Sequence, residues 1–163
     1  MIWIRRHRKG NDMDNQAKAN YEDVNLVLKL YELRREETLR EARAWFASQF
    51  FPQTIDDIKA VGAPDHPRNA SFRMVISYWD MAASFAVRGP LDAALLLESA
   101  GELLLTWAKL EPLIAEIREM TQLPEFLRNL EEIINSVDWA PRRIKWLQAR
   151  LAAQTAAVDS ASN

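Results

Sequence analysis

The chain is 163 residues long, 48% of them hydrophobic, and has a formal net charge of −2 at pH 7. This length is sufficient for one domain with a single hydrophobic core. The absence of cysteine excludes disulfides, thiolate catalysis and zinc–sulfur sites.

Basic residues are concentrated at the amino end. Residues 1–12 hold four basic side chains and one acidic one, which leaves 17 basic and 22 acidic residues in the remainder. A mildly acidic body is a poor platform for nucleic acid. No apolar run approaches the roughly 20 residues that span a bilayer. We therefore expect a soluble, cytoplasmic protein, with membrane-surface contact through residues 1–9 as the alternative.

Residues 1–20 are polar and aperiodic and predict a flexible basic arm, in which Met13 offers an alternative start for the native chain. The helical domain is expected over residues 21–157, followed by a frayed tail over residues 158–163.

A first long helix is expected from Tyr21 to Phe50, ended by Pro52. Its apolar stripe comprises Val24, Val27, Leu28, Tyr31, Thr38, Leu39, Ala42, Trp45, Phe46 and Phe50. Arg35 falls within this stripe. We expect its stem to pack on apolar surface with the guanidinium in water; a recognition role or an interhelix ion pair is the alternative.

A short helical turn capped by Thr54 follows, and then the loop at residues 61–69. Asn69 or Ser71 is expected to cap the next helix. Asp65 and His66 are two potential metal ligands with no spacing to a third, so no metal site is expected here.

The segment from Phe72 to Arg88 is apolar on two faces, which is typical of a helix surrounded by protein. Its polar edge is narrow and contains Asp80. A carboxylate isolated between apolar faces is very costly, so Asp80 must be paired or change its protonation. A structural ion pair with Arg73, Arg88 or Arg35 is favoured over a functional carboxylate.

After the turn at Gly89 and Pro90, a second helix is expected to continue to Met120. Its seam alternates by four and three and comprises Leu96, Ala100, Leu103, Trp107, Leu110, Ile114 and Ile117. Pro112 should kink this helix about one turn upstream, near Ala108. A ligand cavity at the kink, lined by Trp79, Trp107 and Met81, is an alternative to ordinary core packing.

Two further helices are expected beyond the turn at residues 121–123. The first carries Phe126 and Leu127, and the second begins near Pro141 behind an Asp138 cap. The last helix sets Trp139 and Trp146 among basic residues that include Arg142 and Arg143. We favour tryptophans that cover the bundle, with docking to an acidic partner, an anionic lipid surface or RNA as the alternative.

Four segments together carry a resemblance to a known family: LYELRREETLREARAWF, YWDMAASFAVRGPLD, TWAKLEPLIAEIRE and PEFLRNLEEI. They are similar to a bacterial family of helical domains of unknown function, over roughly residues 24–135. The resemblance implies an all-helical fold and assigns no activity or functional residue. Some members resemble proteins anchored in a membrane at the amino end, and that anchor is not expected in this chain.

The sequence gives little support for an enzymatic function. Histidine occurs only at His7 and His66. Glu98 and Glu102 share a helix face, but the Glu-x-x-His spacing of carboxylate-bridged metal bundles is missing. We therefore expect no catalysis, cofactor or metal.

The sequence predicts an all-α bundle of five to six helices with a buried central helix. It is expected to act through protein contacts, by self-association or with a regulatory partner. Small-molecule binding is the second interpretation, and peripheral membrane or nucleic-acid binding the third. The candidate interaction or pocket residues are Asp80, Arg35, Trp107, Arg142, Arg143 and Trp146.

Overall fold

The computed structural model describes residues 19–161, with side chains described to residue 156, and this part of the chain is built from helices and turns. The helices are α1 (Tyr21–Leu33), α2 (Glu37–Ser48), α3 (Ile55–Gly62), α4 (Asn69–Val87), α5 (Ala93–Ser99), α6 (Gly101–Leu110), the 3-10 helix η1 (Glu111–Leu113), α7 (Ile114–Thr121), α8 (Arg128–Ser136) and α9 (Ala140–Ala161). The all-α prediction is confirmed. The number of helices differs from five to six because both predicted long helices are interrupted. The membrane contact expected from residues 1–9 lies outside the described residues.

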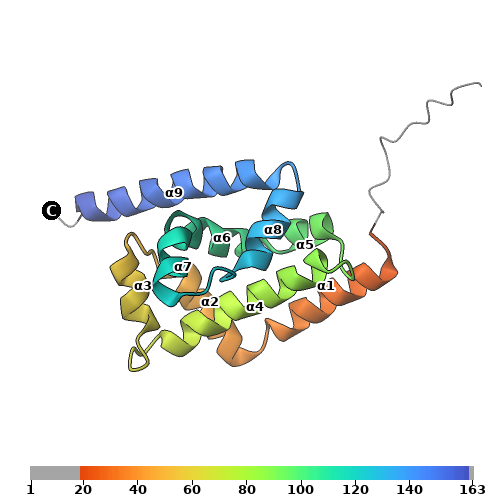
Figure 1. Ribbon diagram of the computed structural model, residues 1–163, viewed down its shortest axis with the longest axis horizontal. Helices are drawn as coiled ribbons and strands as arrows, with labels where there is room; N and C mark the ends of the chain where they lie inside the picture. Colours follow the sequence, from red (N-terminus) through yellow and green to blue (C-terminus); the bar gives the residue numbers. More distant parts are fainter. Residues whose placement is uncertain (1–18, 162–163) are drawn as a thin grey trace, which may run out of the picture.

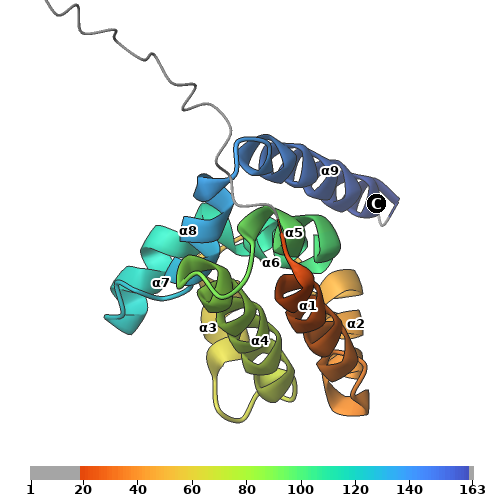
Figure 2. The same ribbon diagram turned by 90° about the vertical axis from the view of Figure 1, so that its right-hand side faces the viewer.

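α4 is the central helix, as the sequence predicted. It packs against α2 on one side and α8 on the other, and it also contacts α3, α5 and α6. Its buried side chains are Phe72, Val75, Ile76, Tyr78, Trp79, Ala82 and Ala83. Figures 1 and 2 show α1 to α4 in a lower layer, α5 to α8 in the middle and α9 lying across the top.

The prediction of one continuous helix from Tyr21 to Phe50 is wrong. The chain leaves the helical conformation at residues 34–36 and starts again as α2. The Glu36 carboxylate accepts a hydrogen bond from the Leu39 N–H at 2.9 Å, and the Arg43 guanidinium donates one to the Arg34 carbonyl at 2.5 Å. These side chains satisfy backbone groups that a continuous helix would have paired, so the break is stabilised.

The second predicted long helix is interrupted twice. Ala100 has φ −123° and ψ 62°, which separates α5 from α6. Pro112 lies in η1, between α6 and α7. Proline has no N–H to donate to an α-helical turn, so the chain tightens at the proline itself rather than kinking near Ala108.

Several helix ends differ from the prediction by a few residues. Asn69 is the first residue of α4 rather than its cap, and its amide donates to the carbonyls of Val61 and Gly62 at the end of α3. α8 begins at Arg128, because Leu127 adopts a left-handed conformation with φ 53°. Thr54, by contrast, stands at the cap position of α3 as expected, and the Asp57 carboxylate accepts from its N–H at 2.9 Å and from its hydroxyl at 3.1 Å.

α9 lies along the bundle and packs against α6 and α8. Ile144 is buried and Leu147 and Leu151 are half-buried, so the predicted apolar stripe faces inward. The helix continues to Ala161, through part of the segment expected to fray. Among the helices described here, none has the length and apolarity needed to cross a bilayer.

Candidate interaction surface

α1 presents an apolar face to solvent. Tyr21, Val24, Leu28 and Tyr31, called here the α1 face, are 79, 44, 54 and 48% exposed. Their spacing of three and four places them on one side of the helix. The sequence had assigned Val24, Leu28 and Tyr31 to a core stripe, and that assignment is wrong for these three positions. The side that meets the bundle carries Leu30 instead.

The exposure of the α1 face is not a sign of a loosely attached helix. The Asp23 carboxylate is buried and accepts from the Asp92 N–H at 2.8 Å, next to the start of α5. The Tyr78 hydroxyl donates to the Leu30 carbonyl at 2.5 Å. These bonds fix α1 near its beginning and in its last turn. Burial raises the pKa of the Tyr78 hydroxyl.

The end of α1 is fixed by Arg43. Its guanidinium donates to the Arg34 carbonyl and, through two nitrogens, to both oxygens of Glu102 at 2.5 Å each. The bidentate bond to Glu102 raises the pKa of Arg43, because it favours the charged guanidinium. Glu102 is therefore a structural ion-pair partner, whereas Glu98 is exposed to solvent.

A small apolar hollow of about 90 Å³ adjoins the α1 face. Leu28 and Tyr31 form its rim, and Tyr78, Trp79 and Leu96 contribute to its walls. The buried Trp79 Nε1–H has no hydrogen-bond partner among the described residues. The surface beside α1 is therefore recessed, so a side chain from a second molecule can insert between its ridges.

Asp80 does not form the predicted ion pair. Its two oxygens accept from the Asn129 side-chain amide at 2.8 Å and from the Leu130 N–H at 3.3 Å, both in the first turn of α8. Within the described residues, no arginine lies within ion-pair distance of this carboxylate. A carboxylate at the positive end of a helix is stabilised by the helix dipole and the free N–H groups, so Asp80 is a structural cap of α8.

Arg35 is also placed differently from the prediction. It lies in the turn between α1 and α2 and is exposed, rather than packed in an apolar stripe. Trp107, by contrast, is 4% exposed in the core, as its central place in the seam predicted.

A hollow of about 280 Å³ lies at Pro112, where a ligand cavity was considered. Its lining includes Phe51, Lys109 and Gln148 rather than the predicted aromatic set. Trp79 and Trp107 are buried elsewhere in the core, and Met81 is 40% exposed on α4.

Lys109 is a buried cation that the sequence analysis missed. Its ammonium donates to the carbonyls of Phe46, Ala47 and Phe50 at 2.6, 3.0 and 2.7 Å, and it lies 4.0 Å from the centre of the Phe51 ring. Burial lowers the pKa of Lys109 to about 8. All three ammonium protons are used at the end of α2, so this cation completes the fold rather than offering a ligand site.

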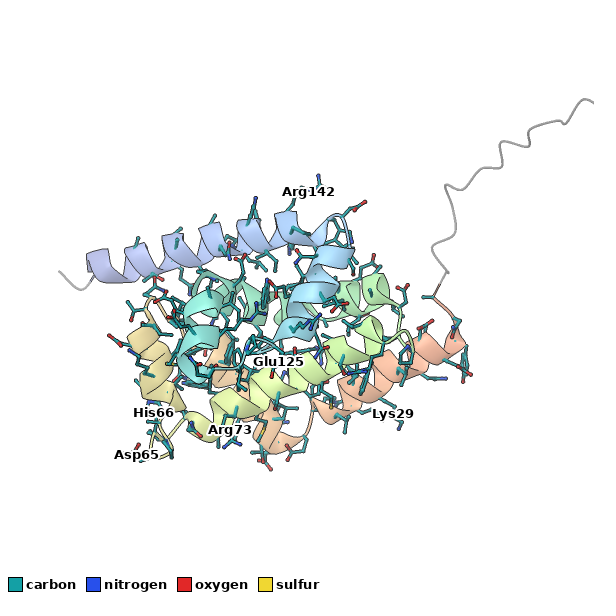
Figure 3. The ribbon with its side chains drawn as sticks, in the orientation of Figure 1. Lys29, Asp65, His66, Arg73, Glu125 and Arg142 are labelled. Carbon is teal, nitrogen blue, oxygen red and sulfur yellow. The ribbon has the colours of Figure 1, made fainter. Side chains whose placement is uncertain are left out.

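A hollow of about 470 Å³ lies between α2, α3 and the loop before α4. Trp45 and His66 line it, and the guanidinium of Arg68 lies 5.6 Å from the centre of the Trp45 ring. The His66 Nδ1 accepts from the Arg68 N–H at 3.1 Å. Asp65 and His66 lie together at one corner of the molecule (Figure 3), and no third potential ligand joins them within the described residues.

The candidate residues of the last helix form a separate surface. Arg142, Arg143 and Trp146 are exposed on α9, whereas Trp139 is half-buried against the core. Figures 1 and 2 both place α9 above the middle layer and α1 below it. The favoured expectation that tryptophans cover the bundle therefore holds for Trp139 and not for Trp146.

Comparison with known proteins gives a family but no activity. No match was found among curated proteins or among solved structures. A family model described as a domain of unknown function (DUF4760) matches residues 21–139, which include α1 to α8 and end before α9. This match confirms the predicted resemblance to a family of helical domains of unknown function. Because it covers most of the 163 residues, the chain belongs to the DUF4760 family.

Proposed function

We propose that this protein is a non-enzymatic helical domain that self-associates by packing the α1 face against the α1 face of a second copy. The observation that carries the proposal is a helix fixed by polar bonds along its length while four large apolar side chains point to solvent. Contiguous exposed apolar surface on a rigid element is typical of an interaction site.

The helix dipoles favour an antiparallel arrangement of the two α1 helices. In an antiparallel pair centred near Leu28, the two dipoles oppose each other favourably, whereas in a parallel pair ends of like sign lie side by side.

The size of the α1 face sets the expected affinity of the dimer. α1 has 13 residues, which makes it about 20 Å long. A pair of such helices buries less than the roughly 800 Å² per partner of a standard interface. We therefore expect a weak dimer, with a dissociation constant on the order of 10–100 µM.

Sedimentation equilibrium of the full chain across this concentration range tests the proposal. Leu28→Glu should raise the dissociation constant at least about tenfold, because it places a carboxylate at the centre of the interface. Leu123→Glu is the matched control, since Leu123 is 47% exposed in the turn after α7. A protein that is monomeric at all these concentrations, or equal effects of the two substitutions, would refute the proposal.

Far-UV circular dichroism of each variant separates loss of association from loss of helix.

A further inference from the structure

α9 differs in charge from the rest of the molecule. Residues 21–139, which the family model matches, hold 12 basic and 20 acidic side chains. Residues 140–156 hold four basic side chains and no acidic one. Those four residues are Arg142, Arg143, Lys145 and Arg150, and all are exposed. A basic helix is thus attached to an acidic domain, immediately after the part that defines the family.

The cations of α9 are organised around an exposed tryptophan. Trp146 is 43% exposed. The guanidinium carbons of Arg143 and Arg150 lie 4.2 and 4.9 Å from the centre of its ring. No α9 cation forms an ion pair within the described side chains. The stacking holds both guanidinium groups in place while their N–H edges stay free to donate.

The other side of α9 is already occupied. Ile144, Leu147 and Leu151 pack on the bundle core, so the basic side is the one that remains outward. Figure 3 shows Arg142 pointing away from the bundle at the top of the molecule. With 22 residues the helix is about 33 Å long, and its outer side is a convex ridge rather than a groove.

We propose that this outer side of α9, called here the basic ridge, docks the protein on the surface of a bilayer that contains acidic phospholipids. Tryptophan favours the headgroup region, where its ring is half in and half out of water. Arginine fits lipid phosphate in a bidentate manner. Both features are expected of a helix that lies on a membrane rather than crossing one.

The geometry favours lipid over single-stranded nucleic acid. Arg143 and Arg150 are three residues before and four residues after Trp146, so they approach the indole from the two neighbouring turns of the helix. A base that stacks on tryptophan needs an uncovered ring face, and here the guanidinium groups compete for that position. A convex ridge also provides no channel for a strand.

Co-sedimentation of the full chain with vesicles tests the proposal. The vesicles are phosphatidylcholine alone or phosphatidylcholine with roughly one quarter phosphatidylglycerol. Binding is expected only to the acidic vesicles and should fall when salt is raised from about 0.1 to about 1 M, because the screening length shrinks from about 10 to about 3 Å.

Two charge-matched double variants locate the surface. Each cation close to an acidic bilayer contributes about fivefold in affinity, from about 1 kcal/mol per charge. Arg143→Gln with Arg150→Gln should therefore weaken binding roughly thirtyfold. Arg40→Gln with Arg73→Gln removes the same charge from exposed positions on α2 and α4 and should change binding less than about threefold.

A third variant separates the contribution of α9 to vesicle binding from that of the basic residues at the amino end. Replacing Arg5, Arg6, Arg8 and Lys9 by glutamine should leave binding that still depends on Arg143 and Arg150. Equal binding to neutral vesicles, equal effects of the two double variants, or complete loss of binding in the arm variant would overturn the proposal. Tight binding of a thymidine oligonucleotide, reduced by the same two α9 substitutions, would replace lipid by nucleic acid as the partner. Self-association through α1 is measured without lipid, so the two proposals can fail independently.

Discussion

The buried ammonium of Lys109 offers the sharpest test of how the bundle is held together. It donates to three carbonyls at the end of α2, and no carboxylate within the described residues pairs with it. Lys109→Met keeps the length of the side chain and removes every donor. Each buried carbonyl that loses its partner costs about 1–3 kcal/mol, and this loss is offset by relief of the buried charge. We expect a net destabilisation of about 2–4 kcal/mol at neutral pH, measured by urea denaturation.

The pH dependence of stability gives a second readout for Lys109. Burial lowers its folded-state pKa to about 8, from 10.5 for the free side chain. Between these values the unfolded state binds more protons than the folded state, so the free energy of unfolding rises with pH. One side of Lys109 faces the hollow at Pro112, and solvent screening there reduces the effect. We expect a rise of about 1 kcal/mol between about pH 8 and 10.

This experiment has an upper pH limit and a control variant. Above about pH 10 the raised pKa of Tyr78 acts in the opposite direction, because the unfolded tyrosine loses its proton first. Lys59→Met is the control, since Lys59 is exposed on α3 and forms a surface ion pair with Asp56. The reasoning is refuted if Lys109→Met costs less than about 1 kcal/mol, or if the variant keeps the rise in stability between about pH 8 and 10.

Substitutions at four further positions test the core and the helix caps. Trp107→Ala should cost about 3–5 kcal/mol in a denaturant melt, and a loss below about 1 kcal/mol would contradict its central place in the core. Asp80→Asn should cost about 1 kcal/mol by the same measurement, because the amide supplies one acceptor where the carboxylate supplies two. Adding Asn129→Ala should cost less in that background than alone, and strict additivity would argue against a shared cap. Asn20 caps α1, so Asn20→Ala should lower the stability by about 1 kcal/mol in thermal unfolding, and Asn20→Gly should lower it much less. No loss in the alanine variant would mean that this cap is dispensable.

The core of the middle layer could be predicted from the sequence because periodicity is a property of the chain itself. Leu103, Trp107 and Ile117 recur at four-three spacing and are all buried. The breaks at Ala100 and Pro112 rotate the later segments but leave these side chains pointing inward. A local pattern was sufficient here, because the same positions remain on one side of consecutive short helices.

The α1 face shows where the same reasoning fails. An apolar stripe predicts that something will cover the helix, but it does not say whether the cover comes from the same chain. Val24 and Leu28 carry the same pattern as residues that lie in the core, and only the placement of α1 at the edge of the bundle distinguishes them. Whether a helix is central or peripheral depends on the whole topology, which periodicity does not contain.

Side chains whose partners are backbone groups were also missed. Asp80 was expected to need an arginine, yet one of its donors is the Leu130 N–H, which every helix start provides. Lys109 reaches carbonyls 59 to 63 residues earlier in the chain. Backbone donors and acceptors are identical at nearly every position, so residue types give no indication of which of them a charged side chain will meet.

The way α1 is fixed has a consequence for how the family can diversify. Two of its attachments use its own backbone, the carbonyls of Leu30 and Arg34, and the third uses the inward carboxylate of Asp23. None of them involves Tyr21, Val24, Leu28 or Tyr31. In the dimer proposed above, substitution at these four positions can therefore change the surface offered to the partner without removing any of the three bonds that fix the helix. That dimer would separate stability from partner choice, because the two would depend on different residues of one short segment.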